Sequence, residues 1–143
     1  MALVTPGTPA PLFKAMNLTG PEISLETYQG KKPVVLMFSS TRVDPAQIGQ
    51  VRDLWKKYRE KVEIITISYK LPSVSMAKAF MQQMGAKFPA IYDPAQNIYK
   101  QYGVETPVGI VVVDVNGNVA YAAEALDAKD TKTLEAAITA HIA

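Results

Sequence analysis

A run of apolar residues at positions 34–38 is the strongest structural signal in the chain. Polar residues do not alternate with apolar ones there, which is typical of a strand covered on both faces of a parallel or mixed sheet. Residues 62–69 and 109–115 are similarly rich in β-branched side chains. The three segments predict the centre of one buried sheet.

Helical periodicity occupies the segments between these runs. From Ile48 to Tyr58 apolar side chains recur every three or four residues, and a second such stripe starts at Val74 and stops at Gly85. An Asn-Gly pair at residues 116–117 is a strong signal for a hairpin turn. Shorter strands are expected at residues 23–25, 88–92 and 119–122, and helices at 94–102 and 131–142.

The predicted order of elements is β-α-β-α-β-α-β-β-α, in one domain that spans residues 1–143. Alternating strands and helices favour parallel pairing, and the closing hairpin adds antiparallel strands to the same sheet. We therefore expect an α/β fold with a central mixed sheet flanked by helices. Residues 1–12, rich in Pro, Thr and Gly, are expected to run extended with little regular structure.

Composition narrows the list of partners. A chain of 143 residues with 48% hydrophobic and 20% charged residues is typical of a globular domain, and its net charge of +2 is too small to indicate nucleic acid. No apolar run approaches the roughly 20 residues that span a bilayer, so we expect no membrane partner. The first residues lack the basic and apolar regions of a secretory signal, which predicts a cytoplasmic location.

The chain contains no cysteine. This excludes disulfides, thiolate nucleophiles and Cys-ligated metal sites. His141 is the only histidine and has no carboxylate or cysteine motif beside it, so it is weak evidence for a metal or a catalytic triad. We predict no metal, and no cofactor either, because the chain lacks the phosphate- and dinucleotide-binding motifs.

The tetrapeptide Asp-Pro-Ala-Gln occurs twice, from Asp44 and from Asp93, and each copy stands where a helix is predicted to begin. Asp suits the N-cap because its carboxylate accepts a backbone N–H of the first turn, Pro suits the next position, and Gln can close a capping box. Asp44 is therefore interpreted as a helix cap, with a general base or anion at a pocket mouth as the alternative.

Two longer segments resemble a known superfamily. Residues 6–38, PGTPAPLFKAMNLTGPEISLETYQGKKPVVLMF, are similar to the G-x-x-A-P-x-F … G-K-x-V-V-L-x-F start of the alkyl hydroperoxide reductase/thiol-specific antioxidant and thiol–disulfide oxidoreductase branch of the thioredoxin-like superfamily. Residues 102–121, YGVETPVGIVVVDVNGNVAY, are similar to its Y-G-V … P-x-x-F-x-I-D-x-x-G-x-V segment. The resemblance covers nearly the whole chain and implies a thioredoxin-like fold, with Pro107 as the cis-proline that faces the active site.

The resemblance fails where this peroxiredoxin-like branch keeps its reactive cysteine. Aligned with the thiol–disulfide oxidoreductases, Val43 and Ala46 occupy the two cysteine positions; aligned with the peroxiredoxins, Asp44 replaces the peroxidatic cysteine. The sequence does not choose between these two alignments. Disulfide exchange and peroxide reduction both need a thiolate, so we expect the oxidoreductase and antioxidant activity of the family to be absent.

Two segments are candidate binding sites. Thr41 and Arg42 precede a helix N-terminus, which suits a carboxylate, phosphate or sulfate, although a solvated loop is the simpler interpretation. Thr106 and Pro107 would place an open backbone edge beside residues 41–44, and the resemblance implies a groove there for an extended peptide. A retained structural turn is the alternative.

The sequence therefore favours a redox-inactive module that binds a protein or a peptide, with a homodimer through a sheet edge as one form of partner. Two other functions stay open. One is an oxidoreductase or antioxidant that works with a cysteine of its partner, and the other is small-anion binding at residues 41–44. Several aromatic residues could line a pocket but are more simply half-buried: Trp55, Tyr92, Tyr99, Tyr102 and Tyr121.

Overall fold

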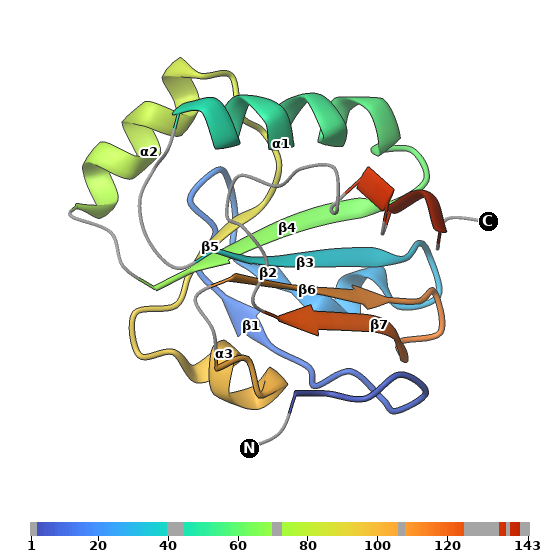
Figure 1. Cartoon of the computed structure of the whole chain (residues 1–143). Helices are drawn as coiled ribbons and strands as arrows, with labels where there is room; N and C mark the ends of the chain where they lie inside the picture. Colours follow the sequence, from blue (N-terminus) through green and yellow to red (C-terminus); the bar gives the residue numbers. More distant parts are fainter. Residues whose placement is uncertain are drawn as a thin grey trace.

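The computed structural model describes residues 3–39, 45–69, 73–105, 108–124, 135–136 and 138–140. Figure 1 shows a central sheet with helices above and below it. This sheet contains five strands in the order β5-β4-β3-β6-β7, and a separate two-stranded sheet pairs β1 with β2. Within the described part of the chain, every helix is too short or too polar to cross a membrane.

Strand β3 (Val34–Ser39) lies at the centre of the five-stranded sheet. It pairs in parallel with β4 (Glu63–Ser68), which pairs in parallel with β5 (Ala90–Tyr92). On its other side it pairs antiparallel with β6 (Val108–Val113), and β6 pairs antiparallel with β7 (Val119–Glu124). The mixed sheet and its closing hairpin, predicted from the sequence, are confirmed.

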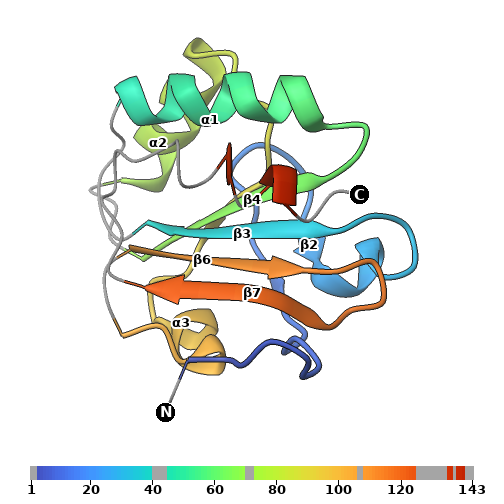
Figure 2. The ribbon, with the colours of Figure 1, turned by 45° about the vertical axis from the view of Figure 1, so that its right-hand side comes forward.

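Both faces of the sheet are covered, which explains the unbroken apolar run in β3. Helices α1 (Pro45–Tyr58) and α2 (Val74–Gln83) lie over one face, and α3 (Asn97–Tyr102) lies over the other (Figure 2). Successive side chains of a strand point to opposite faces, so β3 contributes alternate residues to two cores. Val35 and Met37 pack in the core beneath α1 and α2, and Val34, Leu36 and Phe38 pack in the core beside α3.

The N-terminal segment is bound to the edge of the sheet by its backbone. The N–H of Gly7 donates to the carbonyl of Val119 at 2.8 Å, and the N–H of Val119 donates to the carbonyl of Thr8 at 2.8 Å. Ala10 adds a hydrogen bond to the carbonyl of Gly117 at 2.9 Å. These bonds cover the beginning of β7, an edge strand that would otherwise expose unpaired backbone groups there.

The chain then crosses to the opposite edge of the sheet. Strand β1 (Lys14–Ala15) pairs antiparallel with β2 (Ile23–Ser24), which leads into a 3₁₀ helix, η1 (Leu25–Tyr28). Between β1 and β2 an antiparallel bridge joins Asn17 to Ile91 of β5. The side-chain oxygen of Asn17 also accepts the N–H of Ala90 at 3.0 Å. The N-terminal residues thus contact both edge strands.

The two copies of Asp-Pro-Ala-Gln differ in the structure. Helix α1 begins at Pro45, as the first copy predicts, and Asp44 lies outside the described residues. The second copy forms a turn instead of the first turn of a helix, because Gln96 takes a left-handed conformation with φ of 58°. The predicted start of this helix at residue 94 is therefore wrong, and α3 begins at Asn97.

Asp93 nevertheless caps α3, from a greater distance along the chain than an ordinary N-cap. Its carboxylate accepts the backbone N–H groups of Asn97 at 2.9 Å, Ile98 at 2.9 Å and Tyr99 at 3.2 Å. These are donors that the helix itself leaves unpaired. Asp93 is buried, and the three charge-assisted hydrogen bonds compensate for the loss of its hydration.

The helical residues near the C-terminus are attached to the end of α1. The hydroxyl of Tyr58 donates to the carboxylate of Glu135 at 2.9 Å, and Lys57 Nζ lies 3.1 Å from the same oxygen. Ile138, fully buried, packs in the core beneath α1 and α2. The hydrogen bonds from Lys57 and then Tyr58 lower the pKa of Glu135 below its ordinary value of 4.5.

This contact predicts a pH-dependent contribution to stability. Because the pKa of Glu135 is lower in the folded state, its stabilising effect is present above pH 4.5 and is lost as the pH falls through the folded-state pKa. Glu135→Gln should therefore be less stable than the wild type at pH 7, with the difference disappearing near pH 3. Urea unfolding at both pH values measures it, with Glu60→Gln as the exposed control. A difference that does not change with pH would contradict the assignment.

Candidate binding site at the carboxyl edge of the sheet

The structure describes the residues that flank the predicted site. Ser39, which precedes one candidate segment, is the register partner of Val108, which follows the other. The residues that flank the two segments thus lie side by side on adjacent strands, at the carboxyl end of β3. Ala46 lies in the first turn of α1. The other candidate residues, and His141, lie outside the described residues: Thr41, Arg42, Val43, Asp44, Thr106 and Pro107.

The flanking residues lie where the parallel strands have their carboxyl ends, which we call the carboxyl edge of the sheet. Strands β3, β4 and β5 point the same way, and β6, which is antiparallel to β3, begins beside the end of β3. In Figure 1 it is the left-hand edge of the sheet, where α1 also begins. Ligands of open α/β sheets bind at the carboxyl ends of the strands, because loops and helix N-termini converge there. Residues 41–44 and 106–107 lie outside the described residues, so the site at this end of the sheet stays a prediction.

An aromatic cluster lies beneath this edge. The ring of Tyr99 meets that of Phe38 at 5.0 Å and that of Tyr69 at 4.9 Å, both edge to face. Phe38 also lies 5.7 Å from Tyr102. Such pairs add stability beyond the area that they bury. We call Phe38, Tyr69, Tyr99 and Tyr102 the aromatic cluster. Phe38 belongs to β3, and Tyr69 directly follows β4. The cluster therefore supports the ends of the strands beside the predicted site.

The tyrosines of the cluster are structural. Burial raises the pKa values of Tyr99 and Tyr102, so both phenols stay protonated at neutral pH. The hydroxyl of Tyr102 donates to the carbonyl of Pro11 at 2.6 Å, and that of Tyr99 donates to the carbonyl of Ile67 at 3.4 Å. The expectation of half-burial is wrong for these two, which are core residues, and is confirmed for Trp55, Tyr92 and Tyr121.

A pocket of about 320 Å³ opens next to the cluster. Its walls include Tyr99 and Val104, which are buried, and the exposed side chains of Lys100 and Glu105. Glu105, one of its lining residues, directly precedes residues 106–107 in the chain. The pocket thus combines buried apolar walls with one basic and one acidic side chain at its rim. Sequence reasoning missed this pocket because its residues carry no motif.

Among the side chains whose burial the structure describes, Asp93 is the only buried charged one, and it stands at the end of β5. A buried carboxylate in such a position is a candidate general base. Here both oxygens already accept backbone N–H groups of α3, one from Asn97 and two from Ile98 and Tyr99. The carboxylate is therefore occupied by helix capping.

Gly109 is the second residue of β6, and it allows the strands to approach closely. A Cβ atom built on Gly109 would lie 3.1 Å from the carbonyl oxygen of Ala123 in β7 and 3.4 Å from Cγ1 of Val104. The backbone of β7 cannot move away without disturbing the ladder between β6 and β7. A glycine at the start of a predicted strand is the signal that the sequence offered for this close approach.

Two glycine substitutions should therefore have opposite effects. Gly109→Ala should lower the free energy of unfolding by about 1–3 kcal/mol, because the new methyl group overpacks the strands at the site. Gly49→Ala, inside α1, should raise it by about 0.5–1 kcal/mol, because alanine favours the helix. The nearest atoms to that new Cβ, at 3.8 Å, are at ordinary contact distance. Urea unfolding of both variants measures the difference, and equal stabilities would contradict the proposed close approach.

Comparisons with known proteins identify relatives of the chain. The model of the AhpC/TSA family matches residues 6–122. The thiol-disulfide oxidoreductase ResA of Bacillus anthracis is 34% identical over 116 residues, which are 79% of this chain and 66% of the relative. The ResA of Geobacillus thermodenitrificans is 30% identical over 119 residues, 81% of this chain and 67% of the relative. The chain spans about two thirds of the length of these curated relatives.

Solved structures share the fold. A putative thiol:disulfide interchange protein DsbE from Chlorobium tepidum superimposes with a TM-score of 0.78 at 23% identity, covering 98% of this chain and 99% of its own. The mitochondrial 2-cys peroxiredoxin of Plasmodium falciparum gives 0.75 at 21% identity, covering 95% and 93%. These likenesses confirm the thioredoxin-like fold predicted from the sequence.

Proposed function

We propose that the chain, which belongs to the AhpC/TSA family, binds a protein or peptide segment and carries out no thiol chemistry of its own. The observation that carries the proposal is the complete absence of cysteine from its 143 residues. Disulfide exchange and peroxide reduction proceed through a thiolate that attacks sulfur or oxygen. No other side chain supplies an equivalent nucleophile.

The remaining candidates for chemistry at this edge have other tasks. The carboxylate of Asp93 caps α3, and the phenols of Tyr99 and Tyr102 are protonated and buried. The carboxyl edge nevertheless offers a surface for binding. It consists of the end of β3 beside the start of β6, with the aromatic cluster beneath it and the pocket of about 320 Å³ next to it. These features support recognition of a polypeptide, which needs backbone groups and an apolar floor more than a nucleophile.

The first test is a redox assay of the purified chain alone. We expect dithiol-dependent reduction of insulin, and of hydrogen peroxide, at the rate of the buffer blank. The double variant Val43→Cys with Ala46→Cys is the positive control: in the oxidoreductase alignment it forms an intrachain disulfide and gains activity. Turnover by the wild-type chain would contradict the proposal. Turnover that appears only with a cysteine-containing partner would support the alternative of a shared active site.

The second test measures binding at the proposed edge. A stoichiometric partner that places an acidic residue beside Lys100 should bind about tenfold more weakly to Lys100→Glu, because the substitution replaces an attraction between opposite charges by a repulsion between like charges. Lys87→Glu is the matched control. Lys87 is also exposed, but it precedes β5 and so lies toward the amino ends of the parallel strands, away from the proposed site. Native mass spectrometry gives the stoichiometry. Equal losses in both variants, or a chain that remains a monomer without a partner, would contradict the proposal.

A further inference from the structure

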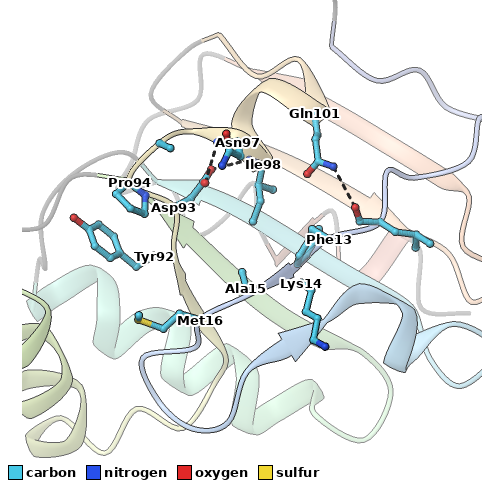
Figure 3. Close-up of a pocket in the computed structure, with 12 residues that line it drawn as sticks. Phe13, Lys14, Ala15, Met16, Tyr92, Asp93, Pro94, Asn97, Ile98 and Gln101 are labelled. Atoms are coloured by element: carbon cyan, nitrogen blue, oxygen red, sulfur yellow. Dashed lines mark hydrogen bonds between the residues drawn. The ribbon is translucent and has the colours of Figure 1, made fainter.

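A second, larger pocket of about 500 Å³ lies between β1 and the turn that joins β5 to α3 (Figure 3). One wall is formed by residues 12–16, and the other by residues 92–95 together with Asn97, Ile98 and Gln101. None of these residues lines the pocket of about 320 Å³ described above. In Figure 3 the two walls face each other across the opening. Asp93 lies on the wall formed by residues 92–95, and the side chain of Lys14 points away from that wall.

The edge of β1 that faces this pocket is unpaired at Lys14. In the antiparallel register Lys14 lies opposite Ser24, and the N–H of Leu25 donates to the carbonyl of Phe13 at 3.1 Å. Hydrogen-bonded and non-hydrogen-bonded pairs alternate along such a ladder, so Lys14 and Ser24 form a non-hydrogen-bonded pair. The N–H and C=O of Lys14 therefore point away from β2, and neither has a hydrogen bond within the described part of the chain.

The open part of this edge is short, because both ends are occupied. On one side the carbonyl of Leu12 accepts Nε2 of Gln101 at 3.2 Å. On the other side the chain meets β5 at the bridge between Asn17 and Ile91. A strand added here can therefore form one full hydrogen-bonded pair, with Lys14, and its neighbouring residues contact the exposed side chains of the segment without further backbone pairing.

The side chains beside this edge have a definite pattern. Residues 12, 14 and 16 alternate with the inward-facing residues and share the outer face of the segment. Leu12 is 53% exposed and Met16 is 50% exposed, which is unusual for large apolar side chains. Between them the ammonium group of Lys14 makes a 3.5 Å ion pair with Glu22, and both side chains are mostly in solvent. The face therefore presents the ammonium group of Lys14, with the carboxylate of Glu22 beside it, between two apolar side chains.

We propose that this pocket binds an extended peptide that pairs antiparallel with β1, with an acidic residue opposite Lys14 and apolar residues two positions before and after it. Strand addition supplies the backbone hydrogen bonds, and alternate side chains supply the specificity. Residues directly opposite one another on antiparallel strands favour opposite charges and apolar pairs. The peptide pattern is thus complementary to Leu12, Lys14 and Met16.

The opposite wall of the pocket is held by hydrogen bonds that need no bound peptide. The carboxylate of Asp93 accepts N–H groups of α3 and so restrains the turn formed by residues 93–96, which includes the left-handed Gln96. A preformed wall lowers the entropy cost of binding. The three N–H donors also compensate for the charge of Asp93, so an acidic peptide residue near Lys14 does not face a free carboxylate.

The test uses two synthetic peptides, acetyl-Val-Thr-Glu-Thr-Val-amide and the same sequence with Lys at the centre. Titration into isotope-labelled protein, followed by NMR, should show saturable shifts at the amide of Lys14. The Glu peptide should bind roughly three- to tenfold more tightly than the Lys peptide. The double variant Lys14→Glu with Glu22→Lys, which keeps an ion pair, should reverse this preference. A preference that does not reverse would overturn the proposal.

Two further experiments distinguish backbone pairing with β1 from nonspecific binding of the peptide. A Glu peptide with an N-methyl group on its central residue should lose saturable binding, because that N–H donates to the carbonyl of Lys14. Met16→Glu should weaken the Glu peptide severalfold, whereas Met76→Glu should not; Met76 is also exposed but lies on α2. Equal binding of the N-methylated peptide, or equal effects of both Met variants, would overturn the proposal. These results do not depend on the function proposed for the carboxyl edge.

Discussion

Complete coverage of β3 is the constraint on which the rest of the structure depends. Its backbone is paired on both sides, with β4 and with β6, and its side chains are divided between two cores. Every other element has a position because it covers or extends this strand. Helices α1 and α2 close one face, while α3 and the N-terminal segment close the other. A single polar residue in the run would leave a buried group without a partner, so the apolar pattern is required.

The same constraint separates the fold from the chemistry. The end of β3, the start of β6 and the aromatic cluster are held in place by contacts beneath the edge, and none of these contacts involves a residue at a cysteine position of the family. The fold is therefore built from contacts that need no cysteine. Fold and function are separable in this way whenever the reactive groups lie on loops outside the core.

The sequence predicted the sheet more reliably than the sites. Periodicity identified β3 and β4 and the stripes of α1 and α2, because burial on one or two faces dictates the residue pattern. It failed at α3, where the same tetrapeptide that begins α1 forms a turn, since Asp93 reaches three N–H groups from further upstream. It also failed for Tyr99 and Tyr102, whose burial depends on contacts with the N-terminal segment and β3, far apart in the chain. Local patterns carry no information about such contacts.

The proposed recognition through a strand edge needs no cysteine, so it is compatible with a cysteine-free member of this family. Thiol chemistry needs one side chain in one place, and a single substitution removes it. Backbone pairing needs only an N–H and a C=O that the fold leaves open, and these are present whatever the side chain. The N–H and C=O of Lys14 are open because the register of β1 with β2 turns them away from β2, and the chain reaches β5 only at Asn17. The register of β1 is thus the feature from which the proposed interaction surface follows, whether or not a thiol is present.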